Sequence, residues 1–271
     1  MKRRTAAILV LLAAWASLAI VFGFFDLDIS KAAVDRQAAW AVFLHRFGEI
    51  PGYALIFILA AIFLGGFFRE PLKQKLPAAL ITIGGLCTAG AGALLGQEKV
   101  IAIGAAGAAA TAAMTVLSLK RDWKPWQDWT GRAILTVIIA AALFPGVFHL
   151  MWGRIRFRDL GPDFAGYTPW WLPRGPYWGL RIDSGFPSGH TAMAAILLPL
   201  LALVKRRSWK DPAKIAAWIA VICWVLLVAV SRVVIGAHFA SDVLFSAGVG
   251  ALCTIILFPE KAAPPHPPIQ K

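Results

Sequence analysis

The chain has 271 residues, of which 59% are hydrophobic and only 15% are charged. A soluble domain is typically about 45–50% apolar and about 25% charged, so this composition excludes an ordinary soluble globular protein. Apolar runs recur that are each long enough to cross ~30 Å of hydrocarbon as a helix. Backbone polar groups find no water inside lipid, so such runs must be helical.

Eight apolar runs predict an all-α, polytopic membrane protein. They lie at 6–25, 51–68, 77–95, 100–119, 131–150, 189–204, 213–230 and 241–258. The pair 77–95 and 100–119 is rich in Gly and Ala and is separated by a short polar turn. It forms either two spans or one buried re-entrant hairpin, and neither alternative changes the orientation of the remaining helices. The first run has no clear cleavage site after it and is expected to stay as a helix.

The net charge of +13 follows the connections between the predicted helices. Seventeen of the 27 basic residues lie in the segments 2–4, 69–75, 120–132, 205–214 and 261–271. The positive-inside rule therefore predicts that these segments and both termini are cytoplasmic. A nucleic-acid-binding protein would gather its positive charge on one solvated domain, which this chain lacks. We expect the bilayer, and no nucleic acid, as a partner; the oligomeric state does not follow from the sequence.

Two segments between the helices have distinctive composition. Residues 26–50 predict an outside loop with an amphipathic helix at the membrane interface. Residues 152–188 form a long irregular segment that is rich in Pro, Gly and aromatic residues. Long loops of this kind in a compact protein are usually functional or disordered, and the aromatic content argues against disorder.

Three polar clusters lie at the predicted outer ends of helices, all on one side of the bilayer. They occupy 149–158, 186–191 and 231–242. In the second cluster, Ser188 can cap the helix that begins at Gly189, where free backbone N–H groups suit a phosphate. His190, beside them, can donate a proton to a leaving alkoxide.

The third cluster predicts a nucleophile. His238 and Asp242 are four residues apart, so on a helix Asp242 would accept a hydrogen bond from one imidazole nitrogen. The other nitrogen would then be a nucleophile. Arg154, Arg156 and Arg232 offer planar forks for phosphate oxygens. No His, Cys or carboxylate cluster at metal-ligand spacing accompanies them, so we expect a site that needs neither metal nor cofactor.

These clusters closely resemble the signatures of the type 2 phosphatidic acid phosphatase superfamily, over roughly residues 131–258. Pro187-Ser188-Gly189-His190 matches one signature, and Ser231-Arg232 followed by His238 and Asp242 matches another. The resemblance implies a six-helix catalytic core, to which this chain would add two helices. It also implies a phosphohistidine mechanism in which His238 attacks phosphorus, Asp242 supports His238 and His190 protonates the leaving group.

The resemblance further implies that Arg156, Arg232 and Ser188 hold the phosphoryl oxygens. The remaining signature departs from the family pattern of Lys, six residues and Arg-Pro, because His149 stands at the lysine position and Phe157 at the proline position. Arg156 matches its arginine. Arg154 follows Gly153, as in a version common among bacterial lipid phosphatases, and is a further candidate for phosphate binding.

Together these features predict N-terminal membrane helices in 1–130, a catalytic core in 131–258 and a cytoplasmic tail in 259–271. The predicted function is hydrolysis of a lipid phosphate at the outer leaflet of a bacterial-type cell membrane. The arginine-rich clusters favour polyprenyl diphosphate as substrate, followed by phosphatidylglycerophosphate and phosphatidate. A lipid phosphotransferase that uses the same histidine and a transporter are the alternatives. We expect His45 and His266 to be packing or interfacial residues.

Overall fold

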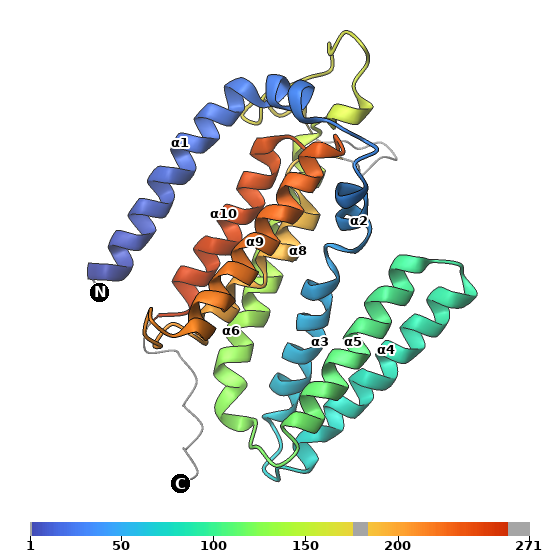
Figure 1. The fold of residues 1–271 in the computed structure, drawn as a ribbon, viewed down its shortest axis with the longest axis vertical. Coiled ribbons are helices and arrows are strands. Elements are labelled where there is room, and N and C mark those ends of the chain that lie inside the picture. Colours follow the sequence, from blue (N-terminus) through green and yellow to red (C-terminus); the bar gives the residue numbers. More distant parts are fainter. Residues whose placement is uncertain (1, 176–183, 260–271) are drawn as a thin grey trace. The chain divides into compact units, whose positions relative to one another are not determined.

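The computed structural model describes residues 2–175 and 184–259, and these residues form helices without any strand (Figure 1). The α-helices are α1 (Lys2–Ala33), α2 (Ala39–Phe47), α3 (Ile50–Gly65), α4 (Leu76–Leu94), α5 (Glu98–Leu117), α6 (Gln127–Val137), α7 (Phe144–Trp152), α8 (Gly189–Ala195), α9 (Pro212–Val234) and α10 (Ala240–Leu257). A π-helical segment, η3 (Ile138–Leu143), joins α6 to α7. The predicted all-α class is confirmed.

Seven helices of the described residues are long and apolar enough to cross a membrane. They correspond to seven of the eight predicted spans. The eighth, predicted at 189–204, is a shorter apolar helix, Gly189–Ala202, which is α8 continued by a 3-10 segment, Leu198–Ala202. At about 1.5 Å per residue it reaches only about 21 Å. Conversely, α1 continues for about two turns beyond the predicted end at residue 25, and these turns carry Asp26 and Lys31.

The chain divides into two compact units. Unit 1 comprises Met1–Glu49, Thr136–Leu198 and Ala216–Ile256, and unit 2 comprises Ile50–Leu135, Pro199–Ile215 and Leu257–Lys271. All the predicted site residues belong to unit 1. This unit also contains the first 49 residues, which the sequence analysis placed outside the catalytic core.

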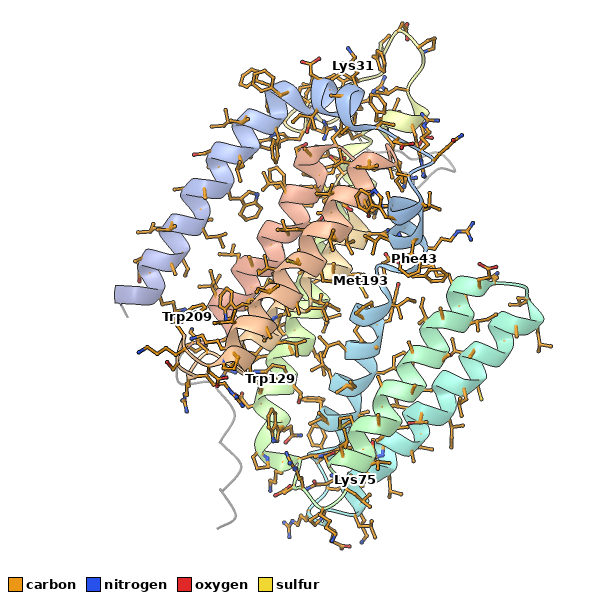
Figure 2. The ribbon with its side chains drawn as sticks, in the orientation of Figure 1. Lys31, Phe43, Lys75, Trp129, Met193 and Trp209 are labelled. Atoms are coloured by element: carbon orange, nitrogen blue, oxygen red, sulfur yellow. The ribbon has the colours of Figure 1, made fainter. Side chains whose placement is uncertain are left out.

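In unit 2, α4 and α5 form an antiparallel hairpin that packs closely through small residues (Figure 1). A Cβ added at Gly104 would lie 2.5 Å from the backbone nitrogen of Ala89, so only glycine permits this approach. Both helices are long enough to cross a membrane, which favours two spans over a re-entrant hairpin. Lys75, below them in Figure 2, lies 3.5 Å from the ring centre of Trp123 and donates a hydrogen bond to the carbonyl of Arg121.

In unit 1, α1 and α10 run in opposite directions. Near the start of α1, Arg4 donates to the carbonyl of Ile256 at the end of α10. Further along, the indole of Trp15 lies over Gly248, where a Cβ would come within 2.5 Å of the ring. Side chains that face neighbouring helices are buried, as Met193 of α8 is at 8% exposure, whereas Phe43 of α2 is 57% exposed (Figure 2).

The end of α7 sets the direction of the first polar cluster. Pro145 lacks a backbone N–H, and the wider turns of η3 directly precede it. Gly153 then takes the left-handed conformation, with φ of +60°, and ends the helix. A residue with a Cβ is strained there. The chain continues in extended conformation and carries Arg154 into the interior of the unit.

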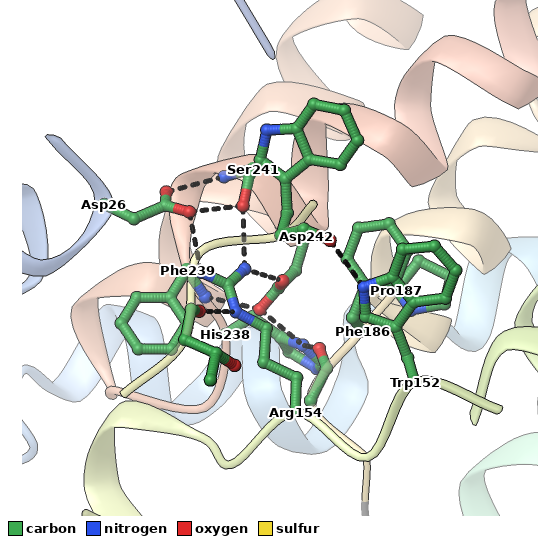
Figure 3. A network of polar contacts seen from close by, with 12 residues as sticks. Asp26, Trp152, Arg154, Phe186, Pro187, His238, Phe239, Ser241 and Asp242 are labelled. Atoms are coloured by element: carbon green, nitrogen blue, oxygen red, sulfur yellow. Dashed lines mark hydrogen bonds and ion pairs between the residues drawn. The ribbon is translucent and has the colours of Figure 1, made fainter. Parts of the chain in front are cut away.

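A buried ion network joins α1 to the start of α10 (Figure 3). Arg154 is 1% exposed; its Nη2 lies 2.9 Å from Asp26, and its Nη1 lies 2.5 Å from Asp242. Asp26 also accepts hydrogen bonds from the backbone N–H of Ser241, at 2.9 Å, and from its hydroxyl. The Arg154 guanidinium lies 4.2 Å from the ring centre of Phe239. One cation therefore holds two carboxylates from distant parts of the chain.

We predict that Arg154→Met strongly destabilises the protein. The substitution leaves two buried carboxylates without a counter-charge, and removal of one partner of a buried ion pair costs about 3–5 kcal/mol. Arg154→Met combined with Asp26→Asn removes one of those carboxylates and should be less destabilised than Arg154→Met alone. The free energy of unfolding in mixed micelles measures both effects, with Arg174→Met at an exposed arginine as the control. Equal losses for Arg154→Met and Arg174→Met would contradict the prediction.

Candidate active site

The three polar clusters predicted from the sequence meet at one end of unit 1. The backbone N–H of Arg158 donates to the carbonyl of Gly236 at 2.9 Å, and that of Gly185 donates to Arg154 at 2.6 Å. The N–H of Ser188 donates to the carbonyl of Asp242 at 3.2 Å. The ends of α7 and α9 therefore lie beside the starts of α8 and α10, as the predicted topology requires.

His238 lies in the turn between α9 and α10 and is 4% exposed. Its Nδ1 is 2.6 Å from the carbonyl oxygen of Gly185 (Figure 3). A carbonyl only accepts hydrogen bonds, so Nδ1 carries the proton and Nε2 keeps its lone pair. This is the tautomer that a nucleophilic imidazole needs.

The predicted hydrogen bond from His238 to Asp242 was wrong. Nδ1 lies 3.7 Å from the Asp242 carboxylate, beyond hydrogen-bond distance. The prediction assumed a helix from residue 238 to 242, but α10 begins only at Ala240 and Gly236 has a φ of +68°. Asp242 instead accepts the N–H of Phe239 at 2.7 Å, as an acidic residue in the first turn commonly does, and pairs with Arg154.

The surroundings of His238 favour its neutral form. Burial holds the pKa of His238 well below its usual value of 6.5, because the protonated ring would lose its hydration. The positive charges of Arg232 and Arg156 act in the same direction, while the hydrogen bond to Gly185 opposes them. The imidazole therefore keeps its lone pair at neutral pH.

His190, the second residue of α8, has different partners. Its Nδ1 lies 3.2 Å from a carboxylate oxygen of Glu49, and its Nε2 lies 3.1 Å from the carbonyl oxygen of His45. The His190 side chain is 18% exposed, whereas that of Glu49 is 7% exposed. A negative charge therefore lies beside His190, in contrast to the positive charges around His238.

Arg232, near the end of α9, is 3% exposed. Its Nη1 donates to Nδ1 of His45. Its Nε is buried and has no hydrogen-bond partner among the residues that the structure describes. A buried donor of this kind is costly unless it is satisfied, which suits an anion that binds beside it.

Arg154, predicted to bind phosphate, is instead a structural residue. Each of its three nitrogens already donates: Nε to the carbonyl of Thr168, Nη1 to Ser241 and Asp242, and Nη2 to Asp26. Its charge is balanced within the ion network. Arg156, two residues on, lies beside Gly185, where an added Cβ would be 3.2 Å from its Cγ, and its positive charge acts on His238. Arg156 thus remains a candidate for phosphate binding.

The remaining predicted residues shape the start of α8. Ser188 is its N-cap and accepts hydrogen bonds from the backbone N–H and the hydroxyl of Thr191. A Cβ added at Gly189 would meet nothing within 4 Å, so space lies beside that residue. His149 places Nε2 2.7 Å from the carbonyl oxygen of Pro187 and so holds the loop before α8.

Sequence reasoning missed the residues that come from the N-terminal part of the chain. His45 was expected to be a packing residue, yet it contacts both His190 and Arg232. Glu49 and Asp26 were not considered at all. The signal available was weak: His45 and Glu49 are four residues apart in a predicted amphipathic segment. His266 lies outside the described residues.

Within the part of the chain that the structure describes, no group of three or more His, Cys, Asp or Glu side chains could hold a metal ion. The groups around His238 are the Gly185 carbonyl, the Asp242 carboxylate at 3.7 Å and the positive charges of Arg232 and Arg156.

Comparison with known proteins identifies a related family. Residues 134–261 match the model of the PAP2 superfamily. The chain is also similar to phosphatidylglycerophosphatase B of Bacillus subtilis (strain 168), at 38% identity over 137 residues. That match covers 49% of this chain and 60% of the relative, so the chain spans about three fifths of the length of the curated relative it matches. No solved structure matches the chain. The protein is thus a polytopic helical membrane protein whose residues 134–261 are similar to the PAP2 superfamily.

Proposed function

We propose that this protein is a lipid phosphatase that removes a terminal phosphate through a histidine nucleophile. The match of residues 134–261 to the PAP2 superfamily and the similarity to a phosphatidylglycerophosphatase support a phosphoric ester hydrolase. The observation that carries the proposal is that the two histidines have different hydrogen-bond and ion-pair partners. His238 is held neutral, with Nδ1 occupied by Gly185, while His190 lies against the carboxylate of Glu49. One histidine suits a nucleophile and the other suits a general acid.

The reaction has two steps. In the first, Nε2 of His238 forms a bond to phosphorus as the bond from phosphorus to the leaving oxygen breaks. That oxygen takes the electron pair of the broken bond and a proton from His190. In the second, water attacks the phosphohistidine, His190 accepts the proton from water, and orthophosphate leaves as Nε2 regains its lone pair. Arg232 and Arg156 bind the equatorial phosphoryl oxygens, where negative charge is greatest in the transition state.

The substrate is an amphiphile whose phosphate lies at the membrane interface. The site residues lie at the ends of apolar helices, so the acyl or prenyl chain of the substrate stays in lipid while the phosphate reaches His238. The membrane is of the bacterial cell-membrane type, and the charge distribution puts the site at its outer leaflet.

Phosphatidylglycerophosphate is now the favoured substrate. The preference for a diphosphate depended on the positive charge of Arg154, Arg156, Arg158 and Arg232. Of these, Arg154 is neutralised by two carboxylates, and Arg158 lies 3.9 Å from Asp159. Arg156 and Arg232 remain, and two arginines match a phosphate monoester. The name of the similar Bacillus protein points to the same class.

The purified protein should release orthophosphate from phosphatidylglycerophosphate with a higher kcat/KM than from phosphatidate, polyprenyl diphosphate or a water-soluble ester. His238→Ala should abolish turnover and the acid-labile phosphoenzyme, because no other neutral imidazole replaces its Nε2. Because arginines are proposed to bind the phosphate, EDTA should not reduce the rate of orthophosphate release. A kcat/KM for a water-soluble ester that is higher than for all three lipids would refute the lipid specificity. Phosphate found on an added acceptor instead of in solution would indicate a phosphotransferase.

In the pH profile of kcat/KM, the fall on the acid side (the acid limb) should occur well below pH 6.5. Protonation of His238 removes the attacking lone pair, and its pKa is lowered by burial, so the neutral form persists to lower pH than for an exposed histidine. The profile should be measured with two phosphate esters of different pKa, since a limb that moves with the substrate belongs to the substrate. A limb near 6.5 that is the same for both esters would contradict the prediction.

Intact cells can test the proposed orientation. In a variant without its native cysteines, Asp163→Cys should react with a membrane-impermeant maleimide and Ser208→Cys should not. Both positions are exposed, so access to the reagent depends on the side of the membrane and not on burial. Permeabilised cells should label at both positions and serve as the control. The reverse pattern would place the site in the cytoplasm.

A further inference from the structure

His190, the second residue of α8, contacts His45 and Glu49, which lie outside the PAP2 match at 134–261. Glu49 follows the end of α2, where Gly48 closes the helix, and its carboxylate oxygen lies 3.2 Å from Nδ1 of His190. Glu49 is 6% exposed. A carboxylate is expensive to bury without positive charge nearby. Arg232 supplies such a charge, and the imidazole of His190 lies in direct contact with the carboxylate.

Both ring nitrogens of His190 face oxygen atoms that accept hydrogen bonds. Nδ1 faces the Glu49 carboxylate, and Nε2 faces the carbonyl oxygen of His45 at 3.1 Å. A neutral imidazole has one N–H and satisfies only one such acceptor, whereas the protonated ring donates from both nitrogens. The arrangement therefore favours a His190 that carries a proton ready for transfer.

The same segment also holds the phosphate-binding arginine. Nδ1 of His45 accepts a hydrogen bond from Nη1 of Arg232, so this histidine nitrogen is unprotonated. The rings of His45 and His190 are 5.5 Å apart. The charged and titratable groups that face His190 here are thus Glu49 directly and Arg232 by way of His45. Of these, only Glu49 is negative.

We propose that Glu49 is a positioning residue that keeps His190 protonated and oriented as the general acid. The inference rests on the proposed function and extends it to a residue of the N-terminal part of the chain. When substrate binds, the leaving oxygen replaces the His45 carbonyl at Nε2, and Glu49 retains the contact at Nδ1. As the bond from phosphorus to oxygen breaks, the Nε2 proton passes to that oxygen, and His190 becomes neutral with its remaining proton on Nδ1, toward Glu49.

Two substrates separate this role from a merely structural one. Phosphatidylglycerophosphate has a poor leaving group that needs a proton, whereas p-nitrophenyl phosphate has a good one that hardly does. A general acid contributes about 10²–10⁴-fold, so we expect Glu49→Gln to lower kcat on the lipid about tenfold or more. KM should be little changed, and the rate on the aryl ester should fall about threefold at most. Glu49→Asp, which keeps the charge, should recover part of the loss.

The design includes a matched control and a double variant. Glu70→Gln makes the same chemical change at a carboxylate that is 64% exposed and should leave both rates unaltered. His190→Ala should show the same substrate pattern as Glu49→Gln, only stronger. Because Glu49 acts through His190, adding Glu49→Gln to His190→Ala should cause no further loss.

The outcomes are distinguishable. Equal losses on both substrates, or a double variant that is much slower than His190→Ala, would show that Glu49 acts through the fold and overturn the inference. Wild-type rates for Glu49→Gln on both substrates would also overturn it while leaving the phosphatase proposal intact. Failure of the wild-type protein to hydrolyse either ester would refute the proposed function itself.

Discussion

The candidate site depends on the ion pairs that Arg154 makes with two carboxylates in the interior of unit 1. Asp26 comes from α1 and Asp242 from the first turn of α10, and the guanidinium is within 2.9 Å of both. Asp26 binds the N–H of Ser241 and Asp242 binds that of Phe239, so the pair also holds the start of α10. This start follows directly on His238. A buried charge with several directional bonds restricts the backbone more than apolar packing does, at the cost of its desolvation.

The arginines of the candidate site differ in whether a carboxylate balances their charge. Arg154 has its charge balanced by carboxylates before any substrate arrives. Arg232 instead donates to a neutral nitrogen of His45 and keeps its net positive charge, with a buried Nε that lacks a described partner. Only a charge that is not already neutralised attracts a phosphate strongly. The histidines differ as well. The charges of Arg232 and Arg156 act on His238, with the Asp242 carboxylate 3.7 Å from its Nδ1, whereas the Glu49 carboxylate lies 3.2 Å from Nδ1 of His190.

The compact unit that holds the site is larger than the family match. Residues 134–261 contain the predicted site residues, yet three of their partners lie in the first 49 residues. Asp26 pairs with Arg154, Glu49 contacts His190, and His45 contacts His190 and Arg232. The segment that matches the family therefore depends on α1 for its buried counter-charge and on the residues at and after α2 for the partners of His190. A variant truncated to 134–261 would lose both, because no residue within that segment replaces Asp26 or Glu49 in the described contacts.

The sequence alone determined the helical membrane architecture, because long apolar runs have no other stable form in lipid. It also determined that residues of all three polar clusters lie together, since alternate helix ends share one side of the membrane. Tertiary structure decided the roles within that cluster. The helical spacing of His238 and Asp242 suggested a hydrogen bond, but the chain turns at Gly236 and a carbonyl from a distant loop takes that position. Likewise, the sequence alone does not distinguish the role of Arg154 from that of Arg232, because both are arginines. Only the fold supplies Asp26 to one and His45 to the other, because hydrogen-bond partners far apart in sequence have no local pattern to reveal them.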